Sequence, residues 1–289
     1  MTRRRTYWHL EPLGRKPSEY EVVSSKLLYY VDRGGFEVAT PIGHWYKQHQ
    51  TGSPLACTDW EAFRDPRETT YAKYTELQRR KETYVDGLLQ SIETTGYDRR
   101  LTPGCLELHD RLVAPLRYPM HGLQMIASYI GSMAPSGRIV IPCLFQAADE
   151  IRRIQRIAYR VRQLQAIDPV LGTRSKDVWQ RAPKWQPLRQ LVEQLLVTYD
   201  WGEAFVALNV VVKPALDRLW LGRFGERLAL AGDEVTQKIF QSLDEDCAWH
   251  RDWTAALLAL VDHGPLAGWR ERWEPRVAAA VHALEGDAP

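Results

Sequence analysis

The chain has 289 residues, of which 45% are hydrophobic and 26% are charged, and such a composition is typical of a globular protein with a sizeable core. Its 38 Lys and Arg residues against 36 Asp and Glu residues leave a formal net charge of +2, which excludes a chain-wide field that attracts phosphate backbones or anionic membranes. No apolar run approaches the roughly 20 residues of a membrane helix. We therefore expect a cytoplasmic protein that binds neither nucleic acid nor membrane.

The cysteine and tryptophan contents narrow the class further. The four Cys residues are widely spread and contain no Cys-x-x-Cys pair, so the sequence favours reduced thiols over a disulfide framework or a zinc ribbon. Eleven Trp and 13 Tyr residues are many for this length. Large amphipathic rings are common where one chain meets another, so we expect a subunit interface.

Residues 1–65 are expected to form an irregular, aromatic-rich N-terminal arm. Pro and Gly recur throughout this segment and prevent a long helix. Its many aromatic and aliphatic side chains are too apolar for a free tail, and we expect them to pack on another chain that orders the arm. A short β-ladder between residues 27–31 and 36–39 is a further expectation.

Residues 66–289 follow a helical period and are expected to form one helical domain. A capping Asp65 followed by Pro66 predicts a helix start there, and Asp233 predicts another. Long helices are predicted at about 66–96, 104–133 with a bend at Pro115 and Pro119, 139–167, 188–230 with an interruption at Pro214, and 234–261. A last helix is predicted to contain residues 269–284. The architecture is therefore an all-α bundle of long helices with an extended N-terminal arm.

The third of these helices has two contrasting faces. Its apolar face is expected to be buried and contains Leu144, Ala147, Ile151, Ile154, Ala158, Val161 and Leu164. Its basic face is expected to be solvated, or to contact an acidic partner, and contains Arg152, Arg153, Arg156 and Arg160.

Long helices in a bundle suggest a di-iron protein, in which two helices each supply a Glu-x-x-His motif. No Glu or Asp in this chain precedes a His by three residues. Two incomplete motifs remain, Tyr118-x-x-His121 and Cys247-x-x-His250. Two alternatives stay open: these His residues are hydrogen-bonded core residues, or His121, His250 and Cys247 form a mononuclear site.

Other catalytic motifs are absent from the sequence. It contains no dinucleotide-binding Gly-x-Gly-x-x-Gly, no phosphate loop and no Gly-x-Ser-x-Gly elbow. Residues 107–110 (Glu-Leu-His-Asp) are expected to form a solvated polar edge, because neighbours on a helix point in different directions. The residues alone therefore predict a non-catalytic helical interaction subunit, with no catalytic, cofactor-binding or metal-binding residue.

Several segments resemble the β subunit of the bacterial multicomponent di-iron monooxygenases, most closely the toluene and alkene monooxygenase branch. They are RTYWHL (5–10), RKPSEY (15–20), WYKQ (45–48), PLRY (115–118), MAP (133–135), DWGEAFV (200–206) and VKP (212–214). The resemblance implies a ferritin-like fold and a hydroxylase of α, β and γ subunits in pairs. It also implies that Tyr118 and Cys247 stand where Glu would precede His121 and His250.

The resemblance assigns the chemistry to other chains. It implies a di-iron centre in a partner α subunit, with NADH, FAD and iron–sulfur clusters in the electron-transfer components. The expected partners are the α and γ subunits, an effector protein and a Rieske-type ferredoxin. The alternative is a free-standing helical metalloenzyme with a site around His121 and His250.

Overall fold

The computed structural model describes residues 8–25 and 41–286. Within these ranges the chain is helical and forms no strand, which confirms the predicted all-α class. The α-helices are α1 (Glu19–Ser24), α2 (Pro41–Tyr46), α3 (Tyr71–Thr95), α4 (Pro103–Leu108), α5 (Arg117–Met133), α6 (Gly137–Leu164), α7 (Ser175–Arg181), α8 (Gln186–Leu196), α9 (Trp201–Phe205), α10 (Lys213–Asp217), α11 (Phe224–Leu230), α12 (Glu234–Leu258) and α13 (Leu266–Glu285).

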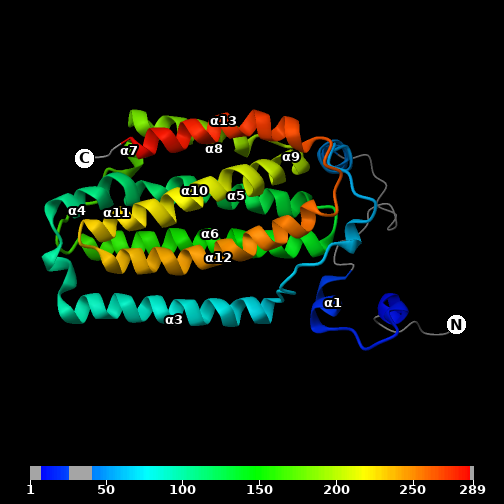
Figure 1. Cartoon of the computed structure of the whole chain (residues 1–289), viewed down its shortest axis with the longest axis horizontal. Coiled ribbons are helices and arrows are strands. Elements are labelled where there is room, and N and C mark those ends of the chain that lie inside the picture. Colours follow the sequence, from blue (N-terminus) through cyan, green and yellow to red (C-terminus); the bar gives the residue numbers. More distant parts are fainter. Residues whose placement is uncertain (1–7, 26–40, 287–289) are drawn as a thin grey trace.

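The long helices run roughly side by side along one axis (Figure 1). Helix α3 lies on one side and packs on α12, while α8 and α13 pack together on the opposite side. Between these layers, α5 packs on α6, and α6 and α10–α11 pack on α12. Five of the tryptophans are fully buried in this body: Trp185, Trp201, Trp220, Trp253 and Trp273. Much of the tryptophan content therefore builds the core, where sequence reasoning had assigned it to an interface.

Of the two helix starts predicted from capping Asp residues, the one at Asp233 is confirmed and the one at Asp65 is wrong. Asp233 caps α12 by accepting a hydrogen bond from the Thr236 amide, as expected. Helix α3, however, begins five residues later than predicted, at Tyr71, because Asp65 closes a tight turn. Its carboxylate accepts hydrogen bonds from the amides of Arg67 and Thr69, and the following chain adopts a left-handed conformation at Glu68 (φ 47°).

The helical stretch predicted over 188–230 is interrupted, but after Leu196 and not at Pro214. Helix α8 ends at Leu196, and a new helix starts after Asp200, whose carboxylate accepts a hydrogen bond from the Glu203 amide. From α9 to α11 the chain stays helical, but it widens into π-helix at Val206–Val212 and Arg218–Arg223. The first π-helical stretch ends two residues before Pro214, which has no amide hydrogen to donate, and the wider turn accommodates the proline without a break.

Helix α6 turns part of its predicted apolar face outward. Leu144 is 60% exposed and Ile151 is 43% exposed. Arg153 and Arg160, predicted to be solvated, are instead fully buried. The prediction of a solvated arginine face is wrong because each of these side chains meets carboxylates from helices distant in sequence, described below.

The described part of the N-terminal arm packs against the chain's own bundle. Tyr20, Leu55 and Phe63 are buried, and the Tyr20 hydroxyl accepts a hydrogen bond from the Asp65 amide. Another chain is therefore not needed to cover these side chains. The predicted β-ladder over 27–39 lies outside the described residues, and the domain boundary at residue 65 stays a prediction.

None of the helices in the described ranges is both long enough and apolar enough to cross a membrane.

Candidate functional site: a buried ion cluster

The residues predicted as a mononuclear site do not come together. His121 is exposed on α5, whereas Cys247 and His250 are buried on α12. His250 fits the alternative that sequence reasoning left open, that of a hydrogen-bonded core residue. Its Nε2 lies 2.8 Å from an Asp149 carboxylate oxygen on α6.

A different pair of motifs meets in the middle of the bundle. Glu150-x-x-Arg153 on α6 faces Cys247-x-x-His250 on α12. The Arg153 guanidinium donates to Glu150 at 2.8 Å, to Asp217 of α10 at 3.0 Å and to the Cys247 sulfur at 2.9 Å. It thereby joins three helices through one fully buried side chain.

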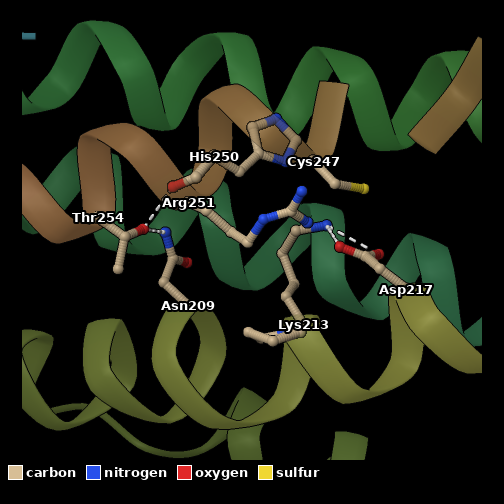
Figure 2. Close-up of a pocket in the computed structure, with 8 residues that line it drawn as sticks. Asn209, Lys213, Asp217, Cys247, His250, Arg251 and Thr254 are labelled. Carbon is tan, nitrogen blue, oxygen red and sulfur yellow. Dashed lines mark hydrogen bonds and ion pairs between the residues drawn. The ribbon is translucent and has the colours of Figure 1, made fainter. Parts of the chain in front are cut away.

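Lys213 supplies a second buried cation beside Arg153. Its ammonium lies 2.5 Å from Glu150 and 3.1 Å from Asp217, one turn further along its own helix. Figure 2 shows Lys213 and Asp217 rising from one helix toward Cys247 and His250 on α12. We call Glu150, Arg153, Lys213, Asp217 and Cys247 the core ion cluster.

Charge and burial set the protonation of this cluster. Burial alone raises the pKa of Asp217, but Lys213 and Arg153 outweigh it and hold that pKa below its ordinary value. Burial, which Arg153 only partly offsets, raises the pKa of the Cys247 thiol. With formal charges, the two acidic and the two basic side chains of the cluster cancel, and the thiol is neutral.

A second polar layer lies between the cluster and α3. Tyr74 donates to Asp149 at 2.8 Å, and Gln78 bridges Asp149 and Asp246 at 2.9 and 3.0 Å. Burial and the neighbouring Asp246 raise the pKa of Asp149. Burial, together with Lys213 and Arg153, lowers the pKa of His250 to about 3, so its imidazole is neutral.

A cavity of about 10 Å³ adjoins the cluster and is lined on one side by Asn209 and Thr254, which share a 3.0 Å hydrogen bond. That volume suits about one water molecule and no organic substrate. Three nearby buried atoms have no hydrogen-bond partner among the described residues: Glu150 Oε2, Arg153 Nε and His250 Nδ1. The core is thus polar and tightly filled.

One other buried group has metal-ligand chemistry. In the described ranges, Cys105, His109 and Asp233 bring ligand atoms within 4.8 Å of one another. The prediction that residues 107–110 form a solvated edge is wrong for His109, which is fully buried with Nε2 2.8 Å from Asp233. Arg160 also contacts Asp233 at 3.0 Å, so a guanidinium already supplies the cation at this position.

Comparison with known proteins identifies the family. A sequence profile described as Methane/Phenol/Alkene Hydroxylase matches residues 45–263. The chain belongs to this hydroxylase family. It is 34% identical to the hydroxylase β subunit of the toluene-4-monooxygenase system of Ectopseudomonas mendocina, over 96% of this chain and 89% of that one. It is 26% identical to the hydroxylase small subunit of a propane 2-monooxygenase of Rhodococcus jostii (strain RHA1), over 98% of this chain and 81% of that one.

Solved structures agree with the sequence comparison. A chain of toluene 4-monooxygenase, in a structure with toluene bound in its resting active site, superposes with a TM-score of 0.92 at 33% identity, covering 99% of this chain and 98% of that one. A chain of phenol hydroxylase from Pseudomonas sp. OX1 superposes with a TM-score of 0.88 at 22% identity, covering 98% and 88%. The relatives are subunits of monooxygenase hydroxylase components, which are oxidoreductases.

The core of this hydroxylase-family chain does not fit a di-iron centre. Such a centre takes two Glu-x-x-His motifs and two further Glu residues. Here Arg153 stands at the His position on α6 and Cys247 at the Glu position on α12, while α5 contains no Asp or Glu at all. Sequence reasoning missed Glu150 and Arg153, although their spacing of three would have revealed them to a search for Glu followed by any basic residue.

Proposed function

We propose that this chain is the non-catalytic β subunit of a multicomponent monooxygenase hydroxylase assembled as (αβγ)₂. The complex would use O₂ and NADH-derived electrons to hydroxylate or epoxidise a small hydrocarbon, either a toluene-type aromatic or an alkene. The observation that carries the proposal is the likeness, over nearly the full length of both chains, to a named β subunit of such a hydroxylase.

The proposal divides the chemistry among several chains. The α subunit holds the di-iron centre that activates O₂, and electrons reach it from NADH through FAD and the iron–sulfur clusters of a reductase and a Rieske-type ferredoxin. An effector protein and the γ subunit complete the system. This chain contributes no ligand, acid or base, and its role is to hold the α subunit in its working arrangement.

The outward face of α6 supports a role in assembly. Leu144, Ile151 and Tyr159 are 60%, 43% and 46% exposed, and their spacing of seven and eight residues places them on one face of the helix. On α3, Leu77 and Tyr84 are also exposed and lie seven residues apart. Exposed apolar side chains gathered on helix faces are typical of subunits that bury them against a partner.

The free thiols support a cytoplasmic location for the complex. Cys57, Cys105, Cys143 and Cys247 are all unpaired, as is usual for a protein of a reducing compartment.

The free-standing metalloenzyme around His121 and His250 finds no support in the geometry. The His121 imidazole is exposed, whereas the His250 imidazole is buried against Asp149.

Co-purification tests the proposed function. We expect the tagged chain to elute with a larger partner that bears two Glu-x-x-His motifs and with a smaller γ subunit, in equal amounts. Iron analysis of the complex should find iron in proportion to the α subunit. Elution of the chain alone, after co-expression with the products of its neighbouring genes, would contradict the proposal.

A pair of matched variants tests the α6 face. Leu144→Glu combined with Ile151→Glu places two charges on the face without touching the core, so the helical signal of the chain should stay unchanged while assembly falls. Ala278→Glu adds a charge to an exposed position of α13 and serves as the control. Equal assembly of the double variant and the control would mean that this face of α6 does not contact a partner.

A further inference from the structure

The core ion cluster is electrically complete without a metal. Glu150 and Asp217 supply two carboxylates, and Arg153 and Lys213 supply two cations. Every one of these side chains is at most 5% exposed. Four charges buried this deeply are tolerated only when each is paired, because an isolated ion in the protein interior costs several kcal/mol.

The two cations lie between carboxylates of different helices, as metal ions do in a di-iron bundle. There, carboxylates from several helices are neutralised by the ions between them. Here the Arg153 guanidinium donates to a residue from each of α6, α10 and α12, and Lys213 bridges the carboxylates of α6 and α10. One cation that contacts three helices does the electrostatic work of a bridging ion.

Two ligand-capable atoms remain without a partner in this core. Glu150 Oε2 and His250 Nδ1 are buried, and neither has a hydrogen-bond partner in the part of the chain that the structure describes. They lie on α6 and α12, the helices of Glu150-x-x-Arg153 and Cys247-x-x-His250. The small cavity beside Cys247 and His250 gives the same region some free volume.

We propose that Arg153 and Lys213 are internal counter-cations that replace the metal ions of a di-iron bundle, and that replacing Arg153 while adding a carboxylate at Cys247 opens this core to a divalent cation. The inference goes beyond the proposed function, because it concerns the fold of the isolated chain and does not depend on the α subunit.

The test is a pair of substitutions in the full-length chain, with Co²⁺ as the probe. Arg153→His together with Cys247→Glu completes both Glu-x-x-His motifs. Three carboxylates then face one remaining cation, Lys213, so the core carries a formal charge of −2 and should bind about one Co²⁺ per chain. Metal analysis measures the amount, and visible absorption reports nitrogen and oxygen coordination.

Two controls ask whether an added carboxylate or an exposed motif is enough to bind the metal ion. Arg153→Lys with Cys247→Glu keeps a cation in the core, and it should bind no Co²⁺ although it has the same added carboxylate. Tyr118→Glu completes a Glu-x-x-His motif with His121 on α5, where the His is exposed, and it should also bind none beyond the unaltered chain.

A second measurement tests the proposal even if the double variant does not fold. Arg153→Met leaves Glu150 and Asp217 short of one cation, so Co²⁺ should raise its thermal midpoint while leaving that of the unaltered chain unchanged, because a ligand stabilises only the state that binds it. The proposal is overturned if a folded double variant binds no Co²⁺, or if the Arg153→Lys control binds as much. It is also overturned if the double variant does not fold and Co²⁺ fails to stabilise Arg153→Met.

Discussion

Replacing Arg160 with Met is the sharpest test of the buried arginines of α6. The Arg160 guanidinium donates to Asp98 through two 2.8 Å hydrogen bonds and to Asp233 at 3.0 Å, while its Nε donates to the Thr236 hydroxyl at 2.8 Å. Methionine fills similar space but leaves both carboxylates without their cation. Breaking a buried pair in this way costs about 3–5 kcal/mol, and two stranded carboxylates favour the upper end.

The assay is urea unfolding of the isolated chain, with Arg162→Met as the control. Arg162 lies on the same helix but is exposed and donates to the nearby Gln165, so its loss should change the free energy of unfolding by no more than about 0.5 kcal/mol. Since domains are stable by about 5–15 kcal/mol, the Arg160 variant should lose a third or more of its stability.

The loss should depend on pH in a defined direction. In the unaltered chain, burial raises the pKa of Asp233, but His109 and Arg160 outweigh it and hold that pKa below its ordinary value. Asp233 therefore stabilises the fold above its unfolded pKa, and this contribution fades as the pH falls toward the lowered folded pKa. Without Arg160 the pKa of the folded Asp233 carboxyl rises, because one of the groups that lower it is gone. The folded variant then takes up a proton more readily, and the stability difference between the two proteins should narrow on acidification. A loss below about 1 kcal/mol, or one that widens in acid, would refute the reasoning.

Three further outcomes follow from the structure. Gly122→Ala places a methyl group against Val192 Cγ1 at the contact of α5 and α8, and it should destabilise the chain by about 1–3 kcal/mol. Gly87→Ala places a methyl group with no atom within 4 Å, and in the same denaturation assay it should be neutral or raise the free energy of unfolding by up to about 1 kcal/mol. The pKa of His250 is lowered to about 3, whereas an unfolded His titrates near 6.5, so the contribution of the neutral imidazole to stability is complete above pH 6.5. Below that pH the free energy of unfolding should fall by roughly 1.4 kcal/mol per pH unit. His250→Gln should remove this slope, and an unchanged slope would exclude a buried neutral imidazole. Metal analysis of the purified chain should find no iron, and about two irons per chain would contradict the counter-cation account.

The helical period and the capping residues predicted most of the bundle. Strongly periodic segments such as α12, with Asp233 as its cap, could be located because these signals are local. The break at Val197–Asp200 was missed, although Asp200 is followed by Glu203 and caps the next helix through the same kind of local signal as Asp233. The turn at Asp65 was mistaken for a helix start because the same residue types cap both structures.

The candidate site was largely hidden from the sequence for a physical reason. An arginine is assigned to solvent unless its partners are known, and the carboxylate partners of Arg153 and Arg160 come from positions more than 60 residues away as well as from nearby Glu150. Only the packed bundle brings these charges together. Because α6 turns Arg153 and Arg160 into the core, it turns Leu144 and Ile151 outward. We propose that these two side chains pack on a partner subunit, which the sequence of one chain does not contain.

Turnover per assembled complex tests the central claim, that this chain acts by scaffolding, most directly. His250→Gln and Cys247→Ala change the two residues of the incomplete motif on α12, and His121→Ala changes an exposed residue and serves as the control. We expect activity to fall only in proportion to the amount of complex formed, with turnover per assembled complex unchanged for all three variants. A His250 or Cys247 variant that assembles fully, keeps the iron of the α subunit and loses turnover by orders of magnitude would place chemistry in this chain and contradict the account.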